Sequence, residues 1–128
     1  MIMPTFDIAT AGDNDRGTSA VEFAIVAPVF IALLVGTFYL CICLLLIGSL
    51  HYAVEEGARC ASVKTSICTD AGTIVAYAQN HYFGPSGSLT FSYAAAPCGN
   101  SVSASINYAL NLGLKTITIP ITATACYP

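Results

Sequence analysis

Residues 23–50 have the sequence FAIVAPVFIALLVGTFYLCICLLLIGSL and contain no charged side chain, histidine, asparagine or glutamine. A helix of this length extends about 42 Å, whereas the hydrocarbon core of a bilayer is about 30 Å thick. A surface helix of a soluble protein would show a polar face, and this one shows none. The apolar region of a secretory signal peptide is shorter, at about 7–15 residues. The run therefore predicts a single membrane-spanning helix.

This helix divides the chain into three parts. Residues 1–17 form a short leader whose second half is polar and turn-rich, residues 18–50 the transmembrane helix, and residues 51–128 one small domain. Residues 51–63 keep a helix-compatible composition, and Glu55 precedes Arg59 by four residues, which favours an ion pair on a helical stalk. We therefore expect one helix of about 40–45 residues that projects beyond the bilayer.

The rest of the domain changes from helical to strand periodicity. Thr69 predicts an N-cap for a short helix over residues 70–82. Side chains then alternate between apolar and small polar over three segments, which predicts strands at about 88–95, 101–109 and 116–125. Pro120 places the third strand at an edge, because proline cannot donate to a neighbouring strand. The expected fold is a single-span membrane helix extended into a small α+β domain with a three-stranded antiparallel sheet.

Four of the six cysteines follow the apolar run, in a domain small enough to need covalent support. Their spacing lacks a CxxC pair, so a disulfide framework is favoured over zinc. In a simple meander Cys98 and Cys126 lie at the same end of the sheet, and Cys60 and Cys68 flank a short link. We predict the pairs Cys60–Cys68 and Cys98–Cys126, one of three connectivities. Disulfides indicate an oxidising compartment, so we expect a cytoplasmic N-terminus and an external domain. The distribution of basic residues on the two sides of the helix does not decide the orientation.

Composition limits the other functions. The net charge is −3 and the four basic residues are scattered, so nucleic-acid binding is not expected. The two histidines, His51 and His81, lack a third ligand at a suitable spacing, so we expect no metal and no other cofactor. Nucleophile elbows, phosphate loops and paired catalytic carboxylates are missing from the sequence. We expect no enzyme activity and no small-molecule substrate, and expect membrane lipid and other transmembrane helices as partners.

The start of the helix carries two kinds of signal. Ser19 and Glu22 match the capping box S-x-x-E, so taken alone Glu22 is more simply a helix cap than a functional residue. Pro28 lies inside the helix and predicts a bend that a neighbouring helix covers. Small residues occur in two pairs, each spaced by four positions, and would let another helix approach closely. They are Ala20, Ala24, Ala32 and Gly36.

Three landmarks in this region resemble the TadE-like family, membrane proteins of tight-adherence (Flp-type) pilus systems. Members typically have an R-G-x-x-A-V-E-F start, a proline a few residues into the apolar run, and an E-G-A-R-x-A segment after it. The matching residues are Arg16, Gly17, Ala20, Val21, Glu22, Phe23, Pro28, Glu56, Gly57, Ala58, Arg59 and Ala61. The resemblance covers residues 16–63, about a third of the chain.

The resemblance implies a pilin-like protein of the bacterial inner membrane, with its domain in the periplasm. In such proteins a peptidase cleaves after a glycine, here Gly17, and the acidic fifth residue, here Glu22, pairs with a neighbour's new amino terminus. The resemblance therefore favours a functional Glu22 in a minor pilin or assembly factor. Two alternatives remain open. One is an accessory structural subunit of a larger respiratory or photosynthetic membrane complex, with an uncleaved N-terminus; the other is an anchored binding ectodomain.

Overall fold

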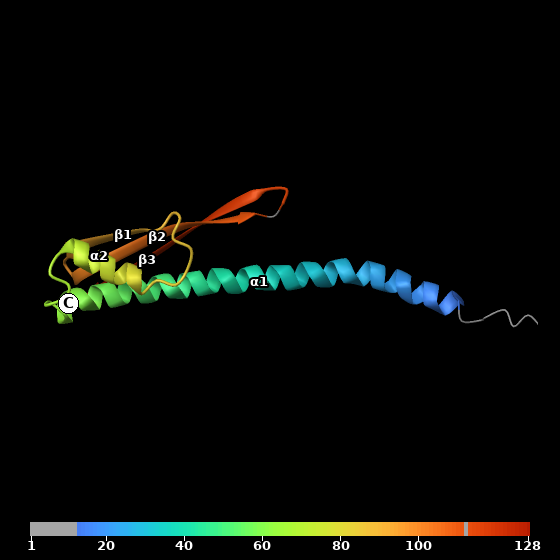
Figure 1. Cartoon of the computed structure of the whole chain (residues 1–128), viewed down its shortest axis with the longest axis horizontal. Helices are drawn as coiled ribbons and strands as arrows, with labels where there is room; N and C mark the ends of the chain where they lie inside the picture. Colours follow the sequence, from blue (N-terminus) through green and yellow to red (C-terminus); the bar gives the residue numbers. More distant parts are fainter. Residues whose placement is uncertain (1–12, 112) are drawn as a thin grey trace, which may run out of the picture. The chain divides into compact units, whose positions relative to one another are not determined.

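The structure, a computed structural model, describes residues 13–111 and 113–128. Its elements are α1 (Asp13–Val63), α2 (Ala71–Asn80), β1 (Thr90–Ala96), β2 (Gly99–Asn111) and β3 (Thr116–Tyr127) (Figure 1). The predicted fold class is confirmed: one long apolar helix, a short helix and a three-stranded antiparallel sheet. The strand bounds differ from the predicted ones by at most two residues. The chain divides into two compact units, Met1–Leu40 and Cys41–Pro128, and α1 runs through both.

Helix α1 is longer than the sequence predicts, with 51 residues, and Pro28 does not interrupt it. It begins at Asp13, so Ser19 lies in its second turn and the predicted capping box of Ser19 and Glu22 is wrong. The physical reason is that an established helix adds each further residue at little cost, so the polar residues before Gly17 extend it. Most of the predicted leader, residues 1–12 of 1–17, lies outside the described residues.

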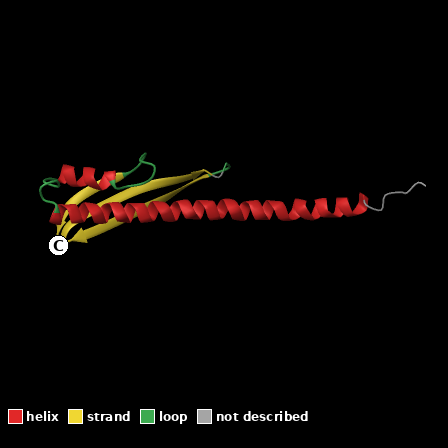
Figure 2. Cartoon of the chain, turned by 60° about the horizontal axis from the view of Figure 1, so that its bottom comes forward, coloured by secondary structure: helices red, strands yellow, loops and turns green. Residues whose placement is uncertain are grey.

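The sheet is a meander in which β2 lies between β1 and β3 (Figure 2). Ala96 pairs with Gly99 across the first turn, and Asn111 pairs with Thr116 across the second. Pro120 lies on β3, an edge strand, as predicted, so its missing amide hydrogen removes no donor needed by a further strand.

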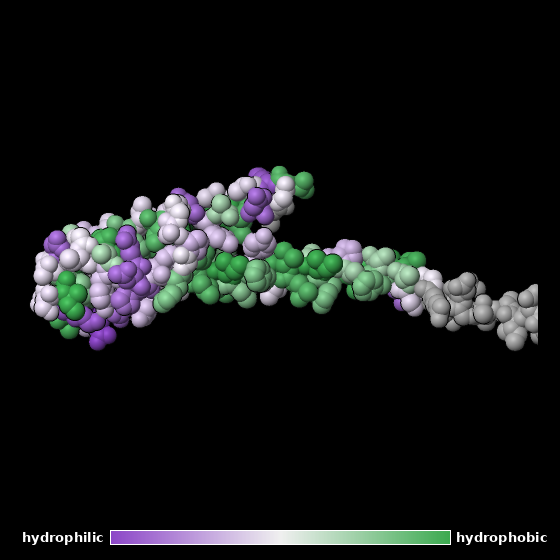
Figure 3. Space-filling model, in the orientation of Figure 1, coloured by the Kyte–Doolittle hydropathy of each residue, from purple (hydrophilic) through white to green (hydrophobic). Residues whose placement is uncertain are grey.

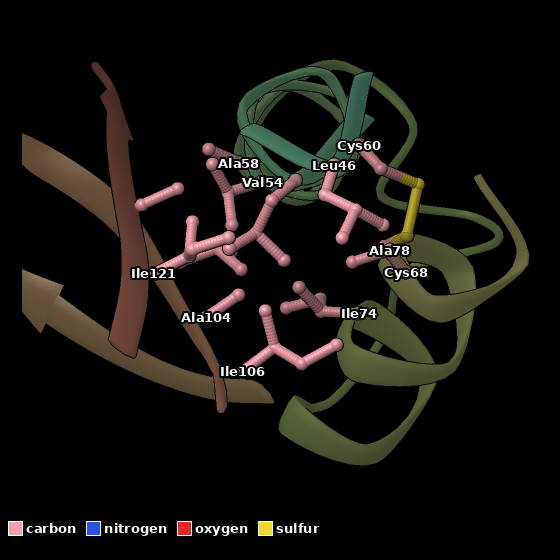
Figure 4. Packing of buried hydrophobic residues seen from close by; sticks show 13 residues of the cluster. Leu46, Val54, Ala58, Cys60, Cys68, Ile74, Ala78, Ala104, Ile106 and Ile121 are labelled. Carbon is pink, nitrogen blue, oxygen red and sulfur yellow. A yellow bond between two sulfur atoms is a disulfide. The ribbon is translucent and has the colours of Figure 1, made fainter. Parts of the chain in front are cut away.

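The core of the Cys41–Pro128 unit lies between α1, α2 and the inner face of the sheet (Figure 4). Alternate residues of β2 point into it, including Val102 and Ile106. Leu46 and Leu50 belong to the uncharged run, yet they are only 1% and 0% exposed. From Leu46 onward, one face of α1 therefore belongs to the domain core. The last residues of the apolar run contribute to that core.

Both predicted disulfides are confirmed. Cys60 and Cys68 join the end of α1 to the segment before α2, eight residues on. Cys98 and Cys126 join the β1–β2 turn to the end of β3, 28 residues on. The antiparallel meander brings the second pair together, because the first turn and the end of β3 lie at the same end of the sheet.

Helix α2 begins one residue later than predicted, with Asp70 and not Thr69 as its N-cap. The Asp70 carboxylate accepts hydrogen bonds from the Thr73 amide at 3.0 Å and the Thr73 hydroxyl at 2.6 Å. The Asp70 amide in turn donates to the Thr73 hydroxyl at 3.1 Å. This reciprocal pair satisfies the free donors of the first turn, and Thr69 offers no comparable set.

The Asp70 cap predicts a pH dependence of stability. Hydrogen bonds from the Thr73 side chain and amide lower the pKa of Asp70 below its ordinary value of 3.8. Because the folded pKa is the lower one, ionised Asp70 stabilises the fold above pH 3.8, and this contribution disappears as the pH falls through the folded pKa. The melting temperature of the wild type should exceed that of Asp70→Asn most at pH 7, with the difference shrinking in acid. A difference that stays constant from neutral pH into strong acid would contradict this account.

Candidate functional site

From residue 23 to residue 40, α1 presents a mostly apolar surface (Figure 3). Its large apolar side chains between residues 21 and 40 are exposed, Phe23 the most so at 73%. They are Val21, Phe23, Ile25, Val26, Val29, Phe30, Ile31, Leu33, Leu34, Val35, Phe38 and Leu40. The segment from Gly17 to Val63 is long and apolar enough to cross a membrane, and almost none of its most apolar stretch is buried within the chain.

Such a surface is not stable in water. Each large apolar side chain left exposed forgoes about 1.5–3 kcal/mol of transfer free energy, and this segment has twelve of them. Soluble monomers rarely expose apolar patches beyond a few hundred Å². The surface therefore belongs in lipid or against other apolar helices, and the protein is membrane-anchored.

Glu22 is the only charged residue between Arg16 and Glu55. It lies inside α1, next to the exposed Phe23. In the part of the chain that the structure describes, its carboxylate has no hydrogen bond or ion pair. Thr37 differs, because its hydroxyl donates to the Leu33 carbonyl of the preceding turn at 2.8 Å. A carboxylate in the hydrocarbon core is costly unless a donor or cation meets it, so Glu22 is stable either among the lipid headgroups or beside a polar partner.

The predicted small-residue stripe lies on this exposed part of α1. Ala20, Ala24, Ala32 and Gly36 are all exposed. A Cβ atom added to Gly36 would meet nothing within 4 Å, so no residue of the described chain occupies the space above it. The stripe is open to a neighbouring helix, and its use for packing remains a prediction.

The second motif, Glu56 to Arg59, lies on the part of α1 that packs against the domain. Gly57 and Ala58 are buried, and a Cβ added to Gly57 would lie 2.9 Å from Ala78 Cβ of α2. Gly57 thus lets α1 and α2 approach closely. Arg59 lies on the exposed side and lines a shallow groove of about 450 Å³ beside the end of β3.

The predicted ion pair between Glu55 and Arg59 is wrong. Both side chains line the same groove, yet within the described residues their charged groups form no ion pair. The reason is their exposure: an exposed pair in water gains at most about 1 kcal/mol, which does not exceed the entropy of fixing two long side chains.

Comparison with known proteins gives one similarity, and it lies on this helix. The pattern of one family, described as TadE-like protein, matches residues 17–59. This part of α1 is therefore similar to the TadE-like family. The match begins at Gly17 and ends at Arg59, so the TadE-like segment includes both the exposed apolar surface and the buried Gly57–Ala58 contact. No curated protein and no solved structure matches the chain.

A cluster outside the TadE-like segment was not foreseen from the sequence. Lys64 Nζ donates to the Tyr77 hydroxyl at 2.7 Å and lies 5.1 Å from the centre of that ring. His81 Nδ1 lies 2.8 Å from the Tyr77 carbonyl oxygen, one turn along α2. The hydrogen bond with Tyr77 raises the pKa of Lys64. The four-residue spacing of Tyr77 and His81 was the available signal; the contact with Lys64 depends on the tertiary fold.

This cluster holds α2 against the end of α1, and the contacts with Tyr77 give His81 a structural role. His51, the other histidine, is exposed on α1. Among residues 13–111 and 113–128, no three histidine, cysteine or acidic side chains gather as a metal site would require. Cys41 and Cys43 are free thiols on α1.

Proposed function

We propose that the protein is a structural or assembly component of a tight-adherence-type pilus system, a minor pilin or assembly factor without enzyme activity. The observation that carries this proposal is the TadE-like match over the helix whose apolar surface the chain leaves exposed. Helices in a membrane associate by close packing and by polar contacts. The small-residue stripe around Gly36 could supply the first, and Glu22, which has no partner among the described residues, the second.

We propose a bacterial inner-membrane location, with the N-terminus in the cytoplasm and the domain in the periplasm. The two disulfides support this orientation, because such bonds persist in oxidising compartments and are rare in the cytosol. In a domain of this size they are structural supports.

We further propose that Glu22 pairs with the amino terminus of a neighbouring subunit. Cleavage after Gly17 would make Thr18 the first residue and Glu22 the fifth. The new ammonium group of one subunit could then meet the carboxylate of another inside a bundle of apolar helices. A buried charge pair of this kind specifies which helices associate, and breaking it leaves an uncompensated charge.

One observation favours the second candidate, an accessory subunit of a larger membrane complex. Helix α1 continues through Gly17 to Asp13, so the backbone at the proposed cleavage site is helical. A helical segment must unwind before a peptidase can act on it. The third candidate, an anchored binding ectodomain, would use the groove beside Glu55 and Arg59.

Mass spectrometry of the native N-terminus tests the proposal. The protein, tagged at its C-terminus and purified from membranes of its natural host, should begin at Thr18. A chain that begins at Met1 or Ile2 would overturn processing and favour the accessory subunit.

The same preparation tests Glu22. Because Glu22→Gln removes the charge and keeps the shape, it should leave processing intact and reduce co-purification of partner subunits severalfold. Glu55→Gln, an equivalent change on the exposed outer part of α1, is the matched control and should co-purify normally. Equal partner recovery for both variants would contradict the proposed role of Glu22.

A further inference from the structure

The tip of the β2–β3 hairpin carries apolar side chains that nothing in the described chain covers. Leu114 is 102% exposed, the full exposure of a free side chain, and Ile117 is 43% exposed. Lys115 lies between them in the sequence and is also exposed. The Asn111 side-chain oxygen accepts from the Gly113 amide at 3.1 Å, and Gly113 has a φ of 81°. The turn is thus held by its own hydrogen bond and presents Leu114 outward.

Hydrogen bonds fix the direction in which this hairpin points within the Cys41–Pro128 unit. The end opposite its tip lies at the C-terminal end of α1. There Ser62 Oγ donates to the Tyr127 carbonyl at 3.2 Å and accepts from the Asn100 side-chain amide at 2.8 Å. From that end, β2 and β3 extend back along α1 in the direction of Cys41 (Figures 1 and 2).

The loop before β1 contributes a further exposed apolar residue, Phe83. The Phe83 amide donates to Ser49 Oγ of α1 at 2.6 Å, yet the Phe83 side chain is 68% exposed. Ser88, in the same loop, bonds Asn107 of β2 through its hydroxyl at 2.9 Å. Beyond Asn107 the hairpin continues past this loop to its tip.

The length of β2 and the rise of α1 together place the hairpin tip at the level where the bilayer is expected to end. From Asn100 to Asn111, β2 extends about 37 Å. From Ser62 back to Cys41, α1 rises about 32 Å, so a hairpin that follows the helix reaches the level of Cys41. A hydrocarbon core that begins at Phe23 takes about 20 helical residues and ends near Ile42.

We propose that the β2–β3 hairpin tip is a second membrane contact, which inserts Leu114 and Ile117 at the boundary between lipid headgroups and acyl chains. The inference rests on the proposed membrane span of α1. It does not depend on the proposed role of the protein in pilus assembly. Lys115 suits this depth, because a lysine can bury its stem and keep its ammonium group among the phosphates.

The chain contains no tryptophan, so one introduced at the tip is a unique fluorescent probe. Full-length Leu114→Trp is reconstituted at low protein density into phosphatidylcholine–phosphatidylglycerol vesicles, with and without brominated acyl chains. Ile67→Trp is the matched control, because Ile67 is also exposed, at 58%, but lies in the Cys60–Cys68 link at the far end of the domain. Emission of Leu114→Trp should be blue-shifted relative to the control, and brominated lipid should quench it severalfold more strongly.

Each outcome bears on the proposal. Melting curves that match the wild type show that the exposed substitutions leave the fold intact. Failure of the protein to float with the vesicles would refute the membrane span, and this inference with it. A floating Leu114→Trp that emits like the control and is not quenched would overturn the inference alone. A blue shift that is insensitive to brominated lipid and disappears on dilution with lipid would assign the tip to a second copy, and would also overturn it.

Discussion

Replacing Cys98 and Cys126 together by alanine is expected to lower the free energy of unfolding of the domain by about 3–4 kcal/mol. The bond closes a loop between residues 28 apart, which restricts the unfolded chain. Cys98 is exposed, so its truncation removes little buried surface and the effect reports mainly the lost cross-link. The measurement is denaturant unfolding of the full chain in detergent, followed by the circular dichroism of the sheet.

The matched control replaces Cys41 and Cys43, which are free thiols on α1. That double variant should unfold at the wild-type denaturant concentration, because it breaks no cross-link. If the Cys98/Cys126 variant also stays within about 0.5 kcal/mol of the wild type, the bond contributes nothing to stability and this account is wrong.

The second large effect is expected at Gly57. Gly57→Val should destabilise the domain by about 1–3 kcal/mol or more, because the added carbons overpack a filled core. A Cβ there lies 2.9 Å from Ala78 Cβ and 3.5 Å from the methyl groups of Val102. Ala78 Cβ is bonded directly to the backbone of α2, so the two helices must separate to relieve the contact. Unfolding in denaturant measures the change.

Gly48→Val provides the comparison on the same helix. A Cβ at Gly48 would meet nothing within 4 Å, and valine is a better helix former than glycine, so this variant should be neutral or slightly stabilising. Gly57→Ala should fall between the two, since its gain in helix propensity offsets part of the contact. Equal stabilities for Gly57→Val and Gly48→Val would refute the close-packing role of Gly57.

Much of the fold was predictable from local sequence patterns. The uncharged run from residue 23 to residue 50 specifies a long helix, and the period-two segments specify three strands. The disulfide pairing followed because a meander brings Cys98 and Cys126 to one end, which the structure confirms. Within the site, Glu22 and Gly36 were placed on one apolar helix and they lie there, whereas Gly17, which was assigned to the leader, also lies in α1.

Other predictions failed where several local options had similar energies. Ser19 matches a capping box, but helix extension competes with capping, and α1 starts at Asp13 instead. The Glu55–Arg59 pair had the right spacing, yet water solvates each charge about as well as its partner would. For α2, Thr69 and Asp70 were adjacent capping candidates, and the bonds with Thr73 select Asp70.

The amino-acid sequence by itself indicated a membrane anchor, because a long run without charged side chains is stable in lipid or against other apolar helices. It also determined the TadE-like motifs, which are local strings of residues. Only the tertiary structure decided that Leu46 and Leu50 are domain core although they belong to the same apolar run. It also decided that Gly57 is a contact between helices and that Leu114 remains uncovered. Burial depends on which distant segments pack together, and no local pattern of residues specifies that.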